Sequence, residues 1–244
     1  MTTVDKVEIE NFERVADDWW NETGAFKPLH KLGPTRIKYL RSQLDPHFSC
    51  DLNNIKPYSK LSILDIGCGG GLVCEPLARL GAKMTGVDAS TKNIEKAITH
   101  AAESNLDIEY LPVTAESLVE KKKQYDAVLA LEVIEHVADV ALFVETCTKL
   151  VKPNGLIIFS TLNRTPKSFA LGIVAAEYIL RWVPAGTHDW KKFLRPSEIA
   201  AQLRRHQYIP SDITGMTYNP INDKFSLSKD DLAVNYFLTA VRQK

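Results

Sequence analysis

The chain has 244 residues, of which 45% are hydrophobic and 25% charged, and its 30 basic residues balance its 30 acidic ones. This composition is typical of a soluble globular protein, and it excludes collagen, a disulfide-rich scaffold and a wholly disordered chain. Because the net charge is zero, we do not expect a protein that binds nucleic acid through bulk charge.

Signals of cellular location are few. The four cysteines are scattered without a C-x-x-C pair, which argues against a zinc ribbon or a disulfide framework and favours a reducing compartment. The N-terminal region is acidic and resembles neither a signal peptide nor an Arg-rich transit peptide. No apolar run is long enough to span a bilayer. We therefore expect a bacterial, cytoplasmic protein.

The first part of the chain predicts a helical cap over residues 1–58. Apolar residues recur at helical spacing over 7–19. A stretch rich in proline and glycine follows at 26–34, and a second helix is expected over 36–44. The cap therefore precedes the main domain, which is expected over 59–244.

Strands and helices alternate in this main domain. Apolar runs predict strands at 61–66, 84–87, 108–113, 126–131 and 156–160. Helical spacing predicts helices at 72–80, 91–103 and 139–150. The alternation predicts a parallel, doubly wound α/β sheet. The end of the chain predicts a helix at 196–205 and two β-like runs at 208–218 and 233–241, which would form a hairpin at the sheet edge.

The first predicted strand ends in a glycine-rich loop, Gly67-Cys68-Gly69-Gly70-Gly71. Glycine there permits a tight turn and a close approach of the backbone to a ligand. Asp88 ends the second strand, where an acid can accept the hydroxyls of a ribose.

Two other nucleotide sites are excluded at this loop. Leu72 occupies the position where a dinucleotide fingerprint needs glycine, and the Gly-Lys-Ser/Thr of a Walker loop is absent. A nucleoside without a pyrophosphate remains. The alternative is a loop that merely joins strand to helix, and Asp88 argues against it.

A second cluster, Glu132-Val-Ile-Glu135-His136, directly follows the fourth strand, at the edge where open α/β sheets hold ligands. If a helical turn begins at Glu132, all three polar side chains share one face. Two carboxylates and an imidazole can hold a divalent cation or act as acid and base. The alternative is a solvated helix start, which acids also favour.

The segments Leu64–Gly71 and Gly86–Asp88 resemble the class I S-adenosylmethionine-dependent methyltransferases, over about residues 60–160. The resemblance implies a Rossmann-like, seven-stranded sheet with a reversed last strand. It also implies that the loop holds the methionyl part of S-adenosylmethionine, that Asp88 contacts its ribose, and that Ala115-Glu116 lines its adenine.

A closer resemblance, over about residues 10–242, is to the ubiquinone biosynthesis O-methyltransferases (UbiG type). It is carried by the upstream run from Leu29 to Arg36 and by the strings at 159–164, 176–180, 186–193, 218–220 and 234–236. It implies two methylations of catechol-type hydroxyls, on a polyprenyl dihydroxybenzene (as a 2-polyprenyl-6-hydroxyphenol methylase) and on 3-demethylubiquinol (as a 3-O-methyltransferase). Other enzymes of the same pathway are left open as partners, and nucleic acid is not expected as one.

The same resemblance assigns site residues. The cofactor positions are Arg36, Gly67, Gly69, Asp88, Glu116 and Leu131. A divalent cation such as Mg²⁺ would be held by Glu132, Glu135 and His136. A guanidinium at position 36 can clamp the methionyl carboxylate through two hydrogen bonds.

The expected chemistry needs few catalytic groups. The sulfonium is already an activated methyl donor, so the protein supplies alignment and a deprotonated nucleophile. A phenol has a pKa near 10 and needs help at neutral pH. A cation held with Glu132 would lower that pKa, or His136 could act as general base. The sequence favours the cation and leaves both open.

An apolar insertion is expected over 165–190, after the fifth strand. It is flanked by cations, which predicts an interfacial segment whose contact with anionic membrane lipids extends over 165–195. A buried lid helix is the alternative. The predicted location is therefore peripheral on the inner membrane.

Three alternative functions remain. One is a methyltransferase for another phenolic or lipid acceptor, and another is a non-catalytic scaffold that binds the cofactor. A nucleic-acid methyltransferase is the least favoured, since no Asn/Asp-Pro-Pro-Tyr motif for a flipped base is present. The tandem Trp19-Trp20 is expected to pack the N-terminal helix rather than to stack on a ligand.

Overall fold

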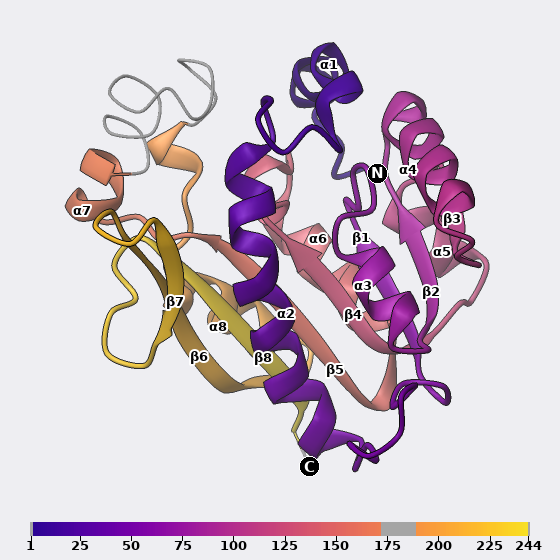
Figure 1. Cartoon of the computed structure of the whole chain (residues 1–244). Helices are drawn as coiled ribbons and strands as arrows, with labels where there is room; N and C mark the ends of the chain where they lie inside the picture. The colour runs from indigo at the N-terminus through magenta and orange to yellow at the C-terminus, as the bar shows by residue number, and fades with distance from the viewer. Residues whose placement is uncertain (1, 172–188, 244) are drawn as a thin grey trace.

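The computed structural model describes residues 2–171 and 189–243, which form an eight-stranded sheet with helices on both faces (Figure 1). The strands are β1 (Ser62–Ile66), β2 (Lys83–Val87), β3 (Glu109–Leu111), β4 (Tyr125–Leu131), β5 (Val151–Leu162), β6 (Tyr208–Asn219), β7 (Lys224–Ser228) and β8 (Asn235–Arg242). The α-helices are α1 (Lys6–Arg14), α2 (Lys27–His47), α3 (Cys74–Arg79), α4 (Thr91–Glu103), α5 (Ala115–Glu120), α6 (Val140–Leu150), α7 (Pro166–Ser168) and α8 (Pro196–Arg205). Short 3₁₀ turns are η1 (Ala16–Asp18), η2 (Ile134–His136) and η4 (Trp190–Lys192).

The strand order is β3-β2-β1-β4-β5-β8-β6-β7. Strands β1 to β5 pair in parallel, and β8 runs antiparallel between β5 and β6. The predicted Rossmann-like sheet with a reversed last strand is therefore confirmed. The predicted terminal hairpin needs correction: its two strands pair as expected, but β8 lies inside the sheet. The edge is taken by β7, which the sequence did not predict.

Two apolar cores lie on the two faces of the sheet. One contains side chains of α2, α3 and α4, such as Leu40, Leu77 and Ala97. The other contains side chains of α5, α6 and α8, such as Leu118 and Phe143. Figure 1 shows α2 crossing one face, with α6 and α8 behind the sheet. Because both faces are covered, the parallel strands carry near-continuous apolar runs.

The cap differs from its prediction in two places. The expected helix over 7–19 ends at Arg14, and a 3₁₀ turn follows. The segment 26–34, expected to be irregular, is the beginning of α2. Pro28 is tolerated there because N–H groups in the first turn of a helix have no acceptor within the helix, so its missing N–H costs no hydrogen bond. Pro34 lies further inside, and burial of α2 against the sheet outweighs its cost.

The middle of the chain departs from prediction at β5 and α5. Strand β5 starts earlier than the expected residue 156: Tyr125 pairs with Val151 and Ala127 with Leu156, so residues 152–155 form a bulge within the strand. Helix α5 was not predicted. Of the insertion 165–190, residues 172–188 lie outside the described residues, and no described helix is long and apolar enough to cross a membrane.

The buried hydroxyl of Tyr39 is one of the groups that connect α2 to the sheet, and it generates a stability prediction. The Tyr39 hydroxyl donates to Asp212 at 3.0 Å and shares a 2.7 Å hydrogen bond with Thr239, while its ring stacks on Phe237. Tyr39→Phe should lower the free energy of unfolding by about 1–2 kcal/mol, measured by urea denaturation, because it removes the hydrogen-bond partner of the buried Thr239 hydroxyl. Tyr218→Phe removes a surface hydroxyl and should change it by less than about 0.5 kcal/mol. Equal effects would contradict the assignment.

Candidate functional site

A cavity of about 1090 Å³ opens at the carboxyl edge of the parallel strands. Open α/β sheets hold their ligands at this edge. The cavity is lined by every residue that the sequence singled out for a site, namely Arg36, Gly67, Gly69, Asp88, Glu116, Leu131, Glu132, Glu135 and His136. The structure therefore gathers both predicted clusters around one space.

The glycine loop has a backbone that only glycine adopts easily. Gly67, Gly69 and Gly71 have φ of 70°, 52° and 90°, in the left-handed region that L side chains avoid. A Cβ on Gly67 would collide with the side chain of Val133, and one on Gly69 with the ring of Trp19. The loop is thus shaped to present backbone at the cavity wall.

Arg36 enters the cavity from α2 and is only 4% exposed. Its Nη2 lies 3.5 Å from Oε1 of Glu132, but Nε and Nη2 have no hydrogen-bond partner among the described residues. A buried guanidinium with unpaired donors is costly. A carboxylate ligand, which accepts two parallel hydrogen bonds from arginine, would remove that cost.

The sequence pattern did not indicate Asp65, which lies in the same wall. Its carboxylate is buried at the end of β1 and accepts a hydrogen bond from the Cys74 thiol at 3.3 Å. Burial raises the pKa of Asp65 to about 7. The sequence does contain a signal that could have identified Asp65: it is an acid inside the apolar run Leu64-Asp65-Ile66, and a buried strand needs no acid for its own stability.

Two acids line the side of the cavity formed by the loops after β2 and β3. Asp88 accepts hydrogen bonds from the backbone N–H groups of Gly69 at 3.0 Å and Ser90 at 2.8 Å, and burial raises its pKa. Glu116 accepts the N–H of Thr3 at 2.7 Å through Oε1, while its buried Oε2 has no partner in the described chain. Both retain acceptor capacity toward a ligand.

The second cluster does not have the predicted helical geometry. The expectation that a helical turn begins at Glu132 is wrong, because Glu132 has φ of +56° and η2 starts only at Ile134. Its carboxylate instead accepts hydrogen bonds from Ser160 Oγ at 2.7 Å and from Asn235 Nδ2 at 2.9 Å. Such strain in a non-glycine residue persists only where surrounding contacts enforce it.

Glu135 and His136 differ in their hydrogen bonding. Glu135 is 4% exposed, and its Oε2 has no hydrogen-bond partner among the described residues. Burial and the charge of Glu132 raise its pKa. His136 Nδ1 lies 3.2 Å from Oε2 of Glu8. Within residues 2–171 and 189–243, no group of three or more His, Cys, Asp or Glu side chains is arranged to hold a metal ion. Glu132, Glu135 and His136 are therefore residue types that can ligate a cation, but they are not arranged to do so.

Glu8 is a second residue that the sequence pattern did not indicate. Its Oε1 accepts a hydrogen bond from Lys192 Nζ at 2.8 Å, so it bridges Lys192 and His136. The hydrogen bond to His136 is the largest cause that holds the pKa of Glu8 at about 2. Burial alone would lower the pKa of His136, but the hydrogen bond to Glu8 and the charge of Glu135 outweigh it, so that this pKa is raised.

The two tryptophans pack the cap against the glycine loop. Trp19 is buried, as predicted, and it stacks on Phe26 with ring centroids 3.7 Å apart. Its Nε1–H donates to Asn93 at 2.9 Å. The Trp20 Nε1–H donates to the carbonyl of Gly70 at 3.0 Å. The cap and the predicted cofactor loop are therefore one connected structure.

Comparison with known sequences gives a consistent family. A model described as "Methyltransferase domain" matches residues 64–159. Three curated relatives carry the name ubiquinone biosynthesis O-methyltransferase: those of Bartonella tribocorum (50% identical, 99% of this chain and 97% of the relative covered), Brucella anthropi (51%, 99% and 97%) and Cereibacter sphaeroides (48%, 99% and 98%).

Comparison with solved structures agrees on the fold. The magnesium protoporphyrin IX methyltransferase of Synechocystis PCC 6803 with bound SAH is 19% identical and has a TM-score of 0.65, with 98% of this chain and 95% of the other covered. The 1,6-didemethyltoxoflavin-N1-methyltransferase of Burkholderia thailandensis is 14% identical, with a TM-score of 0.60 and coverage of 98% and 88%.

The backbone of the glycine loop generates a paired prediction. Gly67→Ala should weaken the binding of S-adenosylhomocysteine at least about tenfold, measured by calorimetry, since it places a Cβ at positive φ against Val133. Gly33→Ala is the matched control, because a Cβ added there, within α2, would meet nothing within 4 Å beyond its chain neighbours and the backbone of its own helix. It should leave the binding of S-adenosylhomocysteine unchanged. Wild-type affinity in Gly67→Ala would refute this account of the loop.

The ion pair of Glu8 and His136 predicts a pH-dependent loss of stability. The lowered pKa of Glu8 stabilises the fold above pH 4.5 and ceases to do so as the pH falls toward 2. The raised pKa of His136 stabilises it below 6.5 and ceases to do so as the pH rises through the folded value. Glu8→Gln should therefore cost about 1–2 kcal/mol near pH 5–6, less at pH 3 and little at pH 2.

Urea unfolding at several pH values measures this difference. Glu10→Gln is the matched control, since Glu10 lies on the exposed side of the same helix and should change stability by less than about 0.5 kcal/mol. A cost of Glu8→Gln that stays constant between pH 3 and pH 6 would contradict the ion pair.

Proposed function

The chain belongs to the ubiquinone biosynthesis O-methyltransferase family, and we propose that it methylates catechol-type hydroxyls of ubiquinone precursors with S-adenosylmethionine as methyl donor. The observation that carries this proposal is the buried guanidinium of Arg36, whose Nε and Nη2 have no hydrogen-bond partner among the described residues and which faces the same cavity as the glycine loop and His136. The two acceptors are a polyprenyl dihydroxybenzene and 3-demethylubiquinol, as the resemblance implies.

The proposed cofactor contacts follow the polarity of the cavity wall. Arg36 pairs with the methionyl carboxylate, and the backbone of Gly67 and Gly69 supports the methionyl chain. Asp88 accepts the ribose hydroxyls, and the free Oε2 of Glu116 accepts from the adenine side. Leu131 supplies an apolar wall. When bound, S-adenosylmethionine provides a methyl group on a sulfonium, and these residues align it.

His136 is the proposed general base. Donation of its Nδ1–H to Glu8 leaves Nε2 as the acceptor in the neutral ring, which can take the proton of the acceptor hydroxyl. A phenol of pKa near 10 needs such a base at neutral pH. The carboxylate of Glu132 is already hydrogen-bonded to Ser160 and Asn235. Its proposed contribution is to fix Arg36 and the part of the cavity where Glu132 and His136 lie, which we call the reaction end.

A divalent cation such as Mg²⁺ is the second proposed role for Glu132, Glu135 and His136. The donor set suits it, but the carboxylate of Glu132 and the Nδ1 of His136 are engaged elsewhere in this structure. The present arrangement therefore does not fit a bound cation, and we favour the general-base role. Removal of metal ions distinguishes the two.

A peripheral contact with an anionic membrane through residues 165–195 completes the proposal, together with a bacterial, cytoplasmic location and contacts with other enzymes of the pathway. Among the described residues of this segment, Phe169 and Leu171 are half exposed, Lys167 lies close to them in the chain, and Lys191 belongs to the same segment. Apolar side chains beside cations are typical of an interfacial segment.

The test is methyl transfer from labelled S-adenosylmethionine to a short-tail demethylubiquinol, with and without EDTA. We expect turnover that is indifferent to EDTA, and a fall in kcat of about 10²–10⁴ in His136→Gln, typical of a lost general base. His206→Gln, which lies outside the cavity, is the control and should retain full activity.

The other outcomes are equally informative. Loss of turnover with EDTA and its return with Mg²⁺ would reverse the preference between the two roles. No turnover at all, with S-adenosylhomocysteine still bound, would refute the proposed acceptors and favour another acceptor or a scaffold.

A further inference from the structure

The cavity has an apolar lobe that the proposed cofactor and base contacts do not use. Its walls come from the start of α2, from the residues just after α7 and from the β6–β7 hairpin. We call its apolar lining the apolar lobe, and it comprises Pro28, Leu29, Leu32, Leu171, Met216 and Phe225.

The lobe begins beside the reaction end of the cavity. Across the sheet, Leu162 of β5 pairs with Asn235 of β8, and Asn235 pairs with Met216 of β6. Directly opposite residues have Cα atoms about 4.5–5.5 Å apart. Since Asn235 donates to Glu132, Met216 lies one strand away from the hydrogen-bond partner of Glu132.

From there the lobe follows the hairpin outward. Met216, Tyr218 and Pro220 are alternate residues of β6 and its turn, and all three line the cavity. At about 3.3 Å per residue they cover roughly 13 Å. Phe225 of β7 pairs with Tyr218, with ring centroids 5.0 Å apart.

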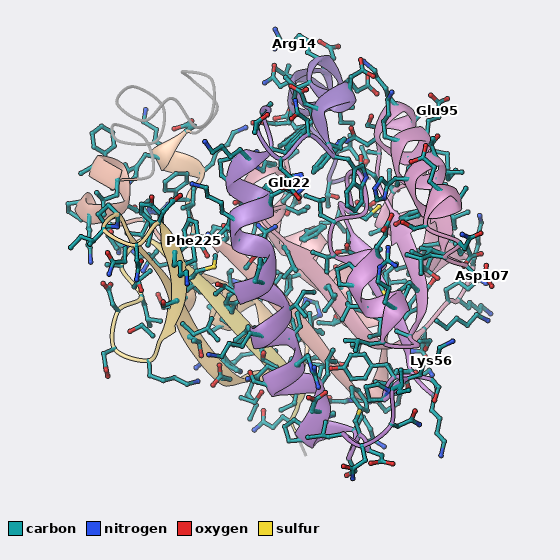
Figure 2. The ribbon with its side chains drawn as sticks, viewed as in Figure 1. Arg14, Glu22, Lys56, Glu95, Asp107 and Phe225 are labelled. Atoms are coloured by element: carbon teal, nitrogen blue, oxygen red, sulfur yellow. The ribbon has the colours of Figure 1, made fainter. Side chains whose placement is uncertain are left out.

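Helix α2 closes the other side of the lobe. Thr35 Oγ1 donates to the carbonyl of Phe225 at 3.1 Å, and Leu29 and Phe225 pack against the core that contains Leu32 and Met216. Figure 2 labels Phe225 on β7, beside α2. The apolar lobe therefore lies between a helix and a hairpin, each of which contributes apolar side chains to it.

Two apolar side chains in or beside the lining of the lobe are exposed. Leu171 lines the lobe and is 48% exposed, and Ile221, which follows Pro220 in the hairpin turn, is 95% exposed.

We infer that the apolar lobe holds the isoprene units of the acceptor nearest to its ring and leads the rest of the tail out between α7 and the β6–β7 turn. The inference rests on the proposed function, because the tail comes with the polyprenyl acceptor. Burial of the tail removes apolar surface from water. The tail does not react, but its binding holds the ring at the reaction end. Binding energy from a remote part of the substrate therefore aligns the reacting groups.

Two acceptors with the same head group test the inference. One is a demethylubiquinol with a short prenyl tail, and the other carries a methyl group in place of the tail. Both are assayed in detergent without membranes, with labelled S-adenosylmethionine. For the wild type we expect a KM at least about tenfold lower for the prenylated acceptor.

Phe225→Ser should raise the KM for the prenylated acceptor about tenfold and leave the KM for the tail-less acceptor and the affinity for S-adenosylhomocysteine unchanged. Leu227→Ser is the matched control: Leu227 is also half-buried, lies two residues along on the same face of β7 and packs on the same core, but it does not line the cavity. It should change neither KM.

A second pair of variants tests the lobe at an exposed position, where a substitution is less able to disturb folding. Leu171 and Phe169 are equally exposed at 48%, and only Leu171 lines the cavity. Leu171→Ser should raise the KM for the prenylated acceptor alone, and Phe169→Ser should not.

Equal effects of Phe225→Ser on both acceptors, or equal effects of the lining and control variants, would overturn the inference while the proposed function stands. So would a wild type that turns over both acceptors with the same KM. A wild type that methylates neither acceptor would overturn the proposed function, and the inference with it.

Discussion

The ion pair between Arg36 and Glu132 is the interaction on which the rest of the site depends. It joins α2 to the end of β4 inside a cavity, 3.5 Å apart, with the guanidinium almost fully buried. One carboxylate does not satisfy five N–H donors. Glu132 is in turn pulled into a left-handed conformation by Ser160 and Asn235, so three strands and one helix converge on this pair. A carboxylate-bearing ligand completes it, which couples cofactor binding to the packing of α2.

The N-terminal cap contacts the cavity at each of its functional parts. The N–H of Thr3 donates to Glu116 on the adenine side, Glu8 holds His136, and Trp20 bonds to the glycine loop. The partners in each contact are far apart in sequence, so the cap has no local reason to adopt its position. Charge also fixes the position of the cap. The negative charge of Glu8 is compensated by His136 and Lys192 together, and both lie far from it in sequence.

Local patterns predicted what local physics determines. The glycine loop, Asp88 and the alternation of strands and helices follow from spacing and apolar runs, and all were found where expected. The turn at Glu132 was mispredicted because its φ is imposed by Ser160 and Asn235, which are distant in sequence. Helix α2 begins within a proline-rich stretch because tertiary burial outweighs propensity. Glu8 and Asp65 were missed for a related reason: only the fold brings Glu8 to His136, and only burial distinguishes Asp65 from an ordinary strand-end acid.

The division of the cavity into a polar and an apolar part follows from the topology of the sheet. The parallel strands β1, β2 and β4 end in loops whose backbone and acids face the polar part. The antiparallel strands beyond β5 present side chains to the cavity instead, among them the apolar side chains of Met216 and Phe225. Asn235, on the reversed strand, stands at the boundary and bonds to Glu132. The reversed strand therefore lies between an apolar surface on β6 and the cluster that contains Glu132, and an acceptor with a polar ring and an apolar tail matches that order.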